Sequence, residues 1–232
     1  MGSEMCIRDS NSAEIINDSL IEEFNPELIG KTASMIYSHG LRANNIITDI
    51  LKQAHQESTD HAESVNLSAM LSQTVDMCIR SISDVEFKQA LKVDISIPSN
   101  SAALIVDSSS LERAFINIID NALYALGKKY HRSHPGTQFT PILAVRLAHE
   151  EDFLVIKISD NGPGIPVHQQ GKVFDEFYTT KPAGEGTGLG LSIARQIIEK
   201  NNGDIQLQST EGQGTEVTIG IPYSAPPMEA SL

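Results

Sequence analysis

An apolar segment runs directly into a glycine-containing turn at residues 153–164, which read Phe153-Leu-Val-Ile-Lys-Ile-Ser-Asp-Asn-Gly-Pro-Gly164. The apolar part predicts a strand over 153–159, with Asp160 at its end. Gly162 and Gly164 follow, and glycine lets another group approach the backbone closely. Taken alone, the turn is more often an ordinary Asp-Asn-Gly loop than a binding site. Its meaning therefore depends on the rest of the chain.

The segments around this strand predict a fold of two layers. Further strands are predicted at 93–97, 142–147, 205–207 and 217–221, the last two as a hairpin. Helices are predicted at 67–82, at 109–126 behind a capping box from Ser109 to Glu112, and at 189–201. Helices beside mostly antiparallel strands indicate the α/β class, as a two-layer sandwich of helices on a mixed, mostly antiparallel sheet.

A long coiled-coil-type helix is predicted before this sandwich, over residues 26–56. Small and apolar residues recur along it every seven positions, which favours packing against another helix. The alternative is a helix that lies on its own domain. The repeating positions are Ile29, Ile36, Ala43 and Ile50.

Four segments of different character follow from these patterns. Residues 1–10 are predicted to be foreign to the natural gene, because Met5-Cys-Ile-Arg-Asp-Ser10 resembles translated adapter sequence. Residues 11–60 are predicted to be the remnant of a helical dimerisation domain. The two-layer domain is predicted over 64–222, and residues 223–232 are predicted to be a disordered tail.

Composition limits the classes of partner. The chain has 232 residues, 40% of them hydrophobic, and a formal net charge of -13. This charge argues against nucleic acid and anionic membranes, which attract basic surfaces. No apolar run approaches the roughly 20 residues of a membrane helix. The two cysteines, Cys6 and Cys78, are too few for a disulfide framework, so a cytoplasmic location is expected.

Two asparagines stand four residues apart in Asn117-Ile-Ile-Asp-Asn121. On the helix predicted for 109–126 this spacing places both amides on one face. Amide oxygens can ligate Mg²⁺ beside phosphate oxygens. The alternative is a pair of solvated or capping asparagines.

A glycine-rich loop precedes the helix predicted at 189–201. Gly184, Gly186, Gly188 and Gly190 alternate, and free N–H groups at a helix N-terminus can receive phosphates. The spacing fits neither a dinucleotide fingerprint nor a P-loop. The loop also suits a mobile lid, and Lys181 could reach a phosphate, although a solvated role is the alternative.

Four motifs in this order resemble the N, G1, F and G2 boxes of the ATP-binding domain that sensor histidine kinases share with gyrase and mismatch-repair ATPases. The motifs are Asn117–Asn121, Asp160–Gly164, Phe174-Asp-Glu-Phe177 and Gly186-Thr-Gly-Leu-Gly190. Two departures are visible: Glu176 replaces the usual proline of the F box, and Tyr124 stands where many kinases carry lysine.

The resemblance implies ATP and Mg²⁺ as cofactors. Asn121, with Asn117, would hold Mg²⁺, and Asp160 would read adenine, with Thr215 nearby. The loop from Gly186 to Gly190 would contact phosphate. The full set of residues expected to bind nucleotide is Asn117, Asn121, Asp160, Gly162, Gly164, Phe177, Lys181, Gly186, Thr187, Gly188, Leu189, Gly190 and Thr215.

The residue at position 117 favours the kinase branch of this superfamily. The hydrolytic branches resemble one another in placing a glutamate four residues before the metal-binding asparagine, where it activates water. Asn117 cannot take that proton. Two alternatives remain: an ATP-hydrolysing switch of the gyrase type, and a nucleotide-binding module without chemistry.

The phosphoacceptor of the kinase family is not recognised in this sequence. None of the seven histidines matches the pattern His-Glu-x-x-Asn-Pro, and His39 is disfavoured because Gly40 and Leu41 follow it. The chain is therefore expected to be a fragment that begins after the phosphorylated helix and does not autophosphorylate alone. The resemblance implies a response regulator receiver domain as partner, a homodimer through the helical region and a membrane anchor upstream in the intact protein.

Overall fold

The structure is a computed structural model and describes Thr32 and residues 63–98, 103–133, 139–182 and 185–223. The chain divides into two compact units, one of residues 59–176 and 190–232, the other of residues 1–58 and 177–189. All the elements named below belong to the first unit. The second unit is described by itself with the site residues that it contains.

A five-stranded sheet forms one layer of the first unit, with strand order β2-β4-β5-β7-β6. Only β2 and β4 run parallel, and the other neighbours are antiparallel. A separate antiparallel pair joins β1 to β3. The strands are β1 (Glu63–Asn66), β2 (Lys92–Ser96), β3 (Ala103–Val106), β4 (Ile142–Glu150), β5 (Phe153–Asp160), β6 (Asp204–Thr210) and β7 (Gly214–Pro222).

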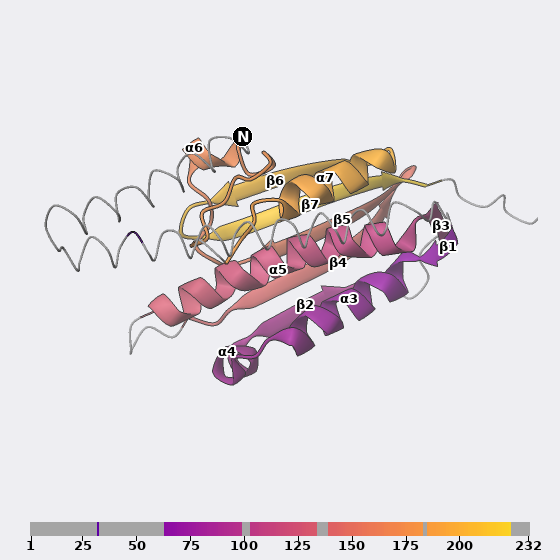
Figure 1. Cartoon of the computed structure of the whole chain (residues 1–232). Coiled ribbons are helices and arrows are strands. Elements are labelled where there is room, and N and C mark those ends of the chain that lie inside the picture. Colours follow the sequence, from indigo (N-terminus) through magenta and orange to yellow (C-terminus); the bar gives the residue numbers. More distant parts are fainter. Residues whose placement is uncertain (1–31, 33–62, 99–102, 134–138, 183–184, 224–232) are drawn as a thin grey trace, which may run out of the picture. The chain divides into compact units, whose positions relative to one another are not determined.

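The helices of the unit are α3 (Leu67–Ser81), α4 (Val85–Ala90), α5 (Ser108–Arg132), α6 (Val167–Gln170) and α7 (Gly190–Lys200). Figure 1 shows α3, α5 and α7 on the same side of the five-stranded sheet. This arrangement confirms the predicted two-layer sandwich on a mixed, mostly antiparallel sheet. Among the described residues, no helix combines the length and apolarity needed to cross a bilayer.

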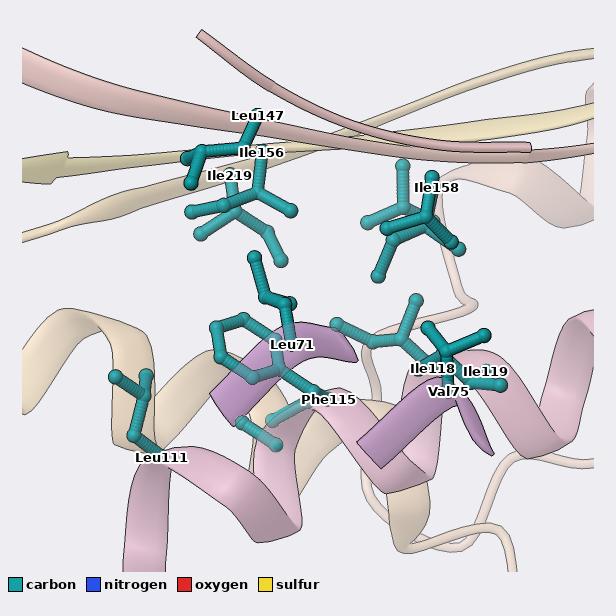
Figure 2. Packing of buried hydrophobic residues seen from close by; sticks show 14 of the residues in the cluster. Leu71, Val75, Leu111, Phe115, Ile118, Ile119, Leu147, Ile156, Ile158 and Ile219 are labelled. Atoms are coloured by element: carbon teal, nitrogen blue, oxygen red, sulfur yellow. The ribbon is translucent and has the colours of Figure 1, made fainter. Parts of the chain in front are cut away.

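The core lies between these two layers. Residues on one side of α5, from Leu111 to Leu126, are buried at helical spacing. They meet the alternating apolar residues of the sheet, so that Phe115 and Ile118 point toward Ile156, Ile158 and Ile219 (Figure 2). The next position along β5 on this face is Asp160, which places a carboxylate where the apolar row of the strand ends.

The start of α5 differs from the prediction. Its N-cap is Asp107, whose carboxylate accepts hydrogen bonds from the backbone N–H groups of Ser109 and Ser110. The prediction of Ser109 as the cap was therefore wrong. The carboxylate also accepts hydrogen bonds from the hydroxyl groups of both serines. A charged acceptor forms stronger hydrogen bonds than a hydroxyl oxygen does, which favours Asp107 as the cap.

The end of α5 also differs, since the helix continues past Leu126 to Arg132. The apolar period stops at Leu126, but Tyr130 in the added turns contacts Phe87 of α4, with ring centroids 5.8 Å apart. The predictions did not include α4, α6, β1 or β3. The predicted helix over 26–56, apart from the helical residue Thr32, and all but Tyr223 of the predicted tail lie outside the described residues.

Candidate functional site

Asp160 is held at the end of β5 by the turn that follows it. Its Oδ1 accepts a hydrogen bond from the backbone N–H of Gly162, at 2.7 Å. Burial raises the pKa of the Asp160 carboxyl to about 6, although the N–H groups of Gly162 and Thr215 and the charge of Lys129 act in the opposite direction. A partly desolvated carboxylate with a fixed orientation is a strong and selective hydrogen-bond acceptor.

The turn packs backbone to backbone against the hairpin of β6 and β7. Gly164 has a φ of +67°, and a Cβ there would lie 2.1 Å from the carbonyl oxygen of Thr210. Gly214 has a φ of +138°, and its Cβ would lie 1.9 Å from the carbonyl oxygen of Asp160. Only glycine fits either position. The two glycines therefore bring Asp160 next to the strand that carries Thr215.

Ser209 determines the direction of the hydrogen bonds beside Asp160. Its Oγ accepts from the N–H of Ile165 at 2.8 Å and donates to the carbonyl oxygen of Gly214 at 2.9 Å. A serine hydroxyl has a single hydrogen. In the 2.9 Å contact between Ser209 Oγ and Thr215 Oγ1, Thr215 is therefore the donor, and its oxygen keeps only lone pairs for other groups.

Asp160 and Thr215 together present acceptors at one end of the sheet. They are opposite residues in the β5–β7 ladder, and Ser209 is opposite Thr215 in the β6–β7 ladder. A shallow depression over the ends of these strands is bordered by all three residues. Two acceptors without a competing donor suit a ligand with an amino group, such as adenine at N6.

Asn117 and Asn121 lie four residues apart on α5, as predicted. The Nδ2 atom of Asn117 is buried and has no hydrogen-bond partner among the described residues. A Cβ added at Gly190 would lie 3.6 Å from Oδ1 of Asn117. The Asn117 amide thus faces the first residue of α7, where a helix N-terminus favours anions.

The remaining predicted residues lie in the second unit, in the segment from Phe177 to Leu189. This segment folds back on itself, because a Cβ at Gly188 (φ +75°) would lie 2.4 Å from the carbonyl carbon of Phe177. Near its middle, Gly186 faces Lys181 and Thr179, and Lys181 N–H donates to Thr179 Oγ1 at 3.1 Å. At its end, Leu189 N–H donates to Thr187 Oγ1 at 3.4 Å.

The structure therefore groups the predicted residues in three places. Asp160, Gly162, Gly164 and Thr215 meet at one end of the sheet, and Asn117 meets Gly190 between α5 and α7, with Asn121 half-buried one turn along. The others are Phe177, Lys181, Gly186, Thr187, Gly188 and Leu189, which share the segment of the second unit. His39 lies outside the described residues.

Sequence reasoning missed Ser209 and Lys129. Ser209 lies near the end of β6, six residues before Thr215. The β6–β7 turn places the two residues opposite each other, and this short spacing was the signal in the sequence that could have identified Ser209. Lys129 follows Lys128 beyond the last buried position of α5, a pattern typical of a solvated helix end. Its Nζ instead reaches backbone oxygens of both turns of the site.

Comparison with known families gives this geometry a context. The family model described as "Histidine kinase-, DNA gyrase B-, and HSP90-like ATPase" matches residues 106–225. The chain belongs to this family. The family predicted from the four motifs is thus confirmed, and a nucleotide-binding role follows from membership in this ATPase family.

The relatives of this ATPase-family chain include sensor kinases. The sensor protein kinase WalK of Staphylococcus haemolyticus (strain JCSC1435) is 30% identical over 186 residues, which are 78% of this chain and 28% of the relative. WalK of Staphylococcus aureus is 28% identical over 205 residues, 87% of this chain and 46% of the relative. The chain thus spans less than half the length of either relative.

Solved structures of two histidine kinases share the fold. A mycobacterial sensor histidine kinase, MprB, is 26% identical with a TM-score of 0.54, over 69% of this chain and 97% of that one. The catalytic domain of the histidine kinase ThkA is 24% identical with a TM-score of 0.55, over 69% and 95%. The similarities to WalK and to MprB favour the kinase branch over the gyrase-type alternative, and the ThkA structure shows the shared fold.

Proposed function

We propose that this chain carries the catalytic domain of a sensor histidine kinase, which binds Mg-ATP and transfers its γ-phosphoryl group to a histidine of a dimerisation helix. The observation that carries the proposal is the buried amide of Asn117, which has no partner on its nitrogen within the described residues and faces the start of α7. A buried amide nitrogen without a protein acceptor fits an oxygen atom of a bound ligand, such as a phosphate oxygen.

The two groups of residues in the first unit suggest two ends of one nucleotide site. Asp160 and Thr215 would accept hydrogen bonds from the adenine amino group, as their acceptor arrangement allows. Asn117 and the N-terminus of α7 would receive the phosphates. Lys181, Gly186 and Gly188 would contact phosphate, as the family resemblance implies.

The residues present also fit a magnesium ion. Asn117 and Asn121 share one face of α5, and amide oxygens are ligands of the hard type that Mg²⁺ takes. The amide of Asn117 would offer its oxygen to the metal and its free N–H to a phosphate oxygen. When bound, Mg²⁺ would neutralise charge on the β- and γ-phosphates, and the asparagines would orient it.

Transfer to a protein histidine is favoured over hydrolysis by the same residue. An amide at position 117 cannot remove a proton from water, so the site lacks the general base that a hydrolase needs there. Phosphoryl transfer depends mainly on positioning and charge neutralisation. In the intact protein, relay to an aspartate of a response regulator, homodimerisation through the helical region and a cytoplasmic location of this domain complete the proposal.

ATP binding is tested by thermal unfolding and calorimetry with Mg-ATP. Nucleotide at about 100 times its dissociation constant should stabilise the fold by about 2.7 kcal/mol. Asp160→Ala and Asn121→Ala should remove this stabilisation. Asp152→Ala is the matched control, because it changes an exposed carboxylate beside the opposite end of β5. Melting that saturating Mg-ATP leaves unchanged would contradict the proposal.

Phosphoryl transfer is tested with γ-labelled ATP. The chain alone should release phosphate far more slowly than the enzyme median of about 10 per second, and Asn117→Glu should raise the rate if a water can occupy the base position. Adding a dimerisation helix with a phosphoacceptor histidine should produce acid-labile label on that helix. Fast hydrolysis by the unchanged chain would support the gyrase-type switch instead.

A further inference from the structure

Lys129 connects the two turns that form the base end of the site. Its Nζ donates to the carbonyl oxygens of Asn161 at 2.7 Å, Gly162 at 2.9 Å and Gly212 at 3.0 Å. A lysine ammonium has three hydrogens, so these three acceptors use its full capacity. Three acceptors around one nitrogen suit an ammonium group, whereas a guanidinium distributes its five hydrogens over three nitrogens in a fixed plane.

The acceptors come from two segments that are far apart in the sequence. Asn161 and Gly162 follow Asp160 directly, whereas Gly212 lies in the β6–β7 turn that leads to Thr215. A hydrogen bond from Gly212 N–H to the carbonyl oxygen of Pro163, at 2.6 Å, joins the same two turns. One side chain of α5 therefore binds both of the turns that adjoin the acceptor pair.

Three further contacts fix the ammonium and the first turn. The Nζ of Lys129 lies 4.7 Å from the centroid of the Phe139 ring, a cation–π distance. Asn161 fastens its own turn to the start of β4, because its Oδ1 accepts from Ile142 N–H at 2.8 Å and its Nδ2 donates to Thr140 at 2.9 Å. The turn that supplies two of the three carbonyls is thus also held by the segment at the start of β4.

We propose that Lys129 is a positioning residue for adenine recognition, which holds the Asp160 turn and the β6–β7 turn together so that Asp160 and Thr215 face the base as a pair. This inference rests on the proposed function, since it concerns the same site. Lys129 itself would not touch the base, because its hydrogens are already donated to the backbone.

Lys129 acts on Asp160 through charge as well as through position. Burial has the largest influence on the Asp160 carboxyl and raises its pKa. The positive charge of Lys129 opposes this rise. The backbone N–H groups of Gly162 and Thr215 also oppose it. Removing the ammonium should therefore raise the pKa of Asp160 beyond about 6, so that less of the carboxylate is ionised near neutral pH.

The test compares three variants in the full chain. Lys129→Met removes the charge and the three hydrogen bonds at similar length, Lys129→Arg keeps the charge but not the tetrahedral geometry, and Lys128→Met is the matched control. Lys128 precedes Lys129 on α5 and is not among the groups that act on Asp160. If Lys129→Met does not fold, Lys129→Arg still tests the loss of the three-point contact by hydrogen exchange and by nucleotide affinity.

Two measurements need no nucleotide. Hydrogen exchange of the Gly162 and Gly212 amides should rise about tenfold in Lys129→Met and Lys129→Arg, because both lose the three-point contact. The pKa of Asp160, followed by NMR, should rise in Lys129→Met and stay near that of the unchanged chain in Lys129→Arg. Lys128→Met should alter neither quantity.

Nucleotide binding then tests the positioning role. Lys129→Met should bind Mg-ATP about tenfold more weakly at neutral pH, and the pH at which affinity is half lost should move upward. Unchanged affinity and pH profile in Lys129→Met would overturn the role of Lys129 while leaving the proposed function intact. If the unchanged chain bound no ATP, the proposed function would fail and the positioning role with it.

Discussion

Gly190, the first residue of α7, faces the side chain of Asn117 on α5: a Cβ at Gly190 would lie 3.6 Å from Asn117 Oδ1. The distance is an ordinary contact, so glycine is not needed there to avoid a clash. What the glycine does is leave open the space next to a buried amide whose nitrogen has no partner among the described residues. The helix N-terminus and the amide thereby become available to the same ligand.

Asn117→Leu should stabilise the nucleotide-free fold and weaken ATP binding. An unsatisfied buried donor costs about 1–3 kcal/mol, and an apolar side chain of similar size removes that penalty. The unfolding midpoint in denaturant should therefore rise, while calorimetry should show at least a tenfold loss of Mg-ATP affinity.

Asn201→Leu is the contrasting variant, because Asn201 Nδ2 already donates to the carbonyl oxygen of Ile197, at 2.8 Å. It should lower stability and leave ATP affinity unchanged. If Asn117→Leu were as destabilising as Asn201→Leu, the amide of Asn117 would be satisfied in the free protein.

Asp160→Asn should show a pH-dependent change in stability. The pKa of Asp160 rises from 3.8 to about 6 on folding, so its contribution to stability is full below about 3.8 and is lost as pH rises through about 6. Near pH 7.5 the buried charge should make the unchanged chain less stable than Asp160→Asn. Thermal unfolding at about pH 7.5 and about pH 5 should show this difference shrinking in acid.

The same titration predicts the pH dependence of binding. ATP affinity of the unchanged chain should fall as pH decreases through about 6, because protonation removes the charged acceptor. Asp160→Asn should bind weakly at every pH and lose this dependence. A flat profile in the unchanged chain would mean that Asp160 does not contact the base.

Gly164→Ala should strongly destabilise the first unit. The residue needs a φ of +67°, and the new Cβ would lie 2.1 Å from the carbonyl oxygen of Thr210. Strain of this kind costs about 1–3 kcal/mol, and the backbone must also shift to relieve the overlap. Chemical denaturation is the measurement.

Gly171→Ala is its control, because nothing lies within 4 Å of a Cβ there and its φ is −66°. That substitution should be neutral or slightly stabilising, since it reduces the freedom of the unfolded chain. Equal effects of the two substitutions would contradict the close approach of the turn to β6.

Ser209→Ala should reduce discrimination between ATP and GTP. Without Ser209, the Thr215 hydroxyl loses its fixed acceptor and can turn its hydrogen toward the ligand. Adenine presents a donor at this position and guanine an acceptor, so the ratio of the two affinities should fall severalfold, roughly 1 kcal/mol or less. Competition calorimetry with both nucleotides gives the ratio. Thr215→Val, which removes the hydroxyl itself, should produce a comparable loss, whereas an unchanged ratio in both variants would exclude the hydroxyl from base selection.

Periodicity in the sequence was sufficient for the main layers of the fold. The apolar spacing of Phe115, Ile118 and Ile119 predicted the helix over them, and alternation predicted β5 and the β6–β7 hairpin, because each of these elements buries one face. Periodicity was insufficient to identify the N-cap of α5, because two neighbouring residues could cap the helix. Asp107 and Ser109 are both good caps, and only their geometry in the folded chain selects Asp107.

By itself, the sequence determined the family and the candidate residues, since the four motifs are local and their order is specific; their individual roles stay predictions. Only the tertiary structure determined which groups from other segments form hydrogen bonds with those residues and with the turns around them. Lys129 and Gly212 are 83 positions apart, yet the ammonium of one binds the carbonyl of the other. Ser209 determines the direction in which the Thr215 hydroxyl donates its hydrogen only because the register of β6 and β7 places the two residues opposite each other. Such effects depend on distances of about 3 Å between segments that are far apart in the sequence. A sequence pattern does not contain these distances, because they arise only when the chain folds and packs.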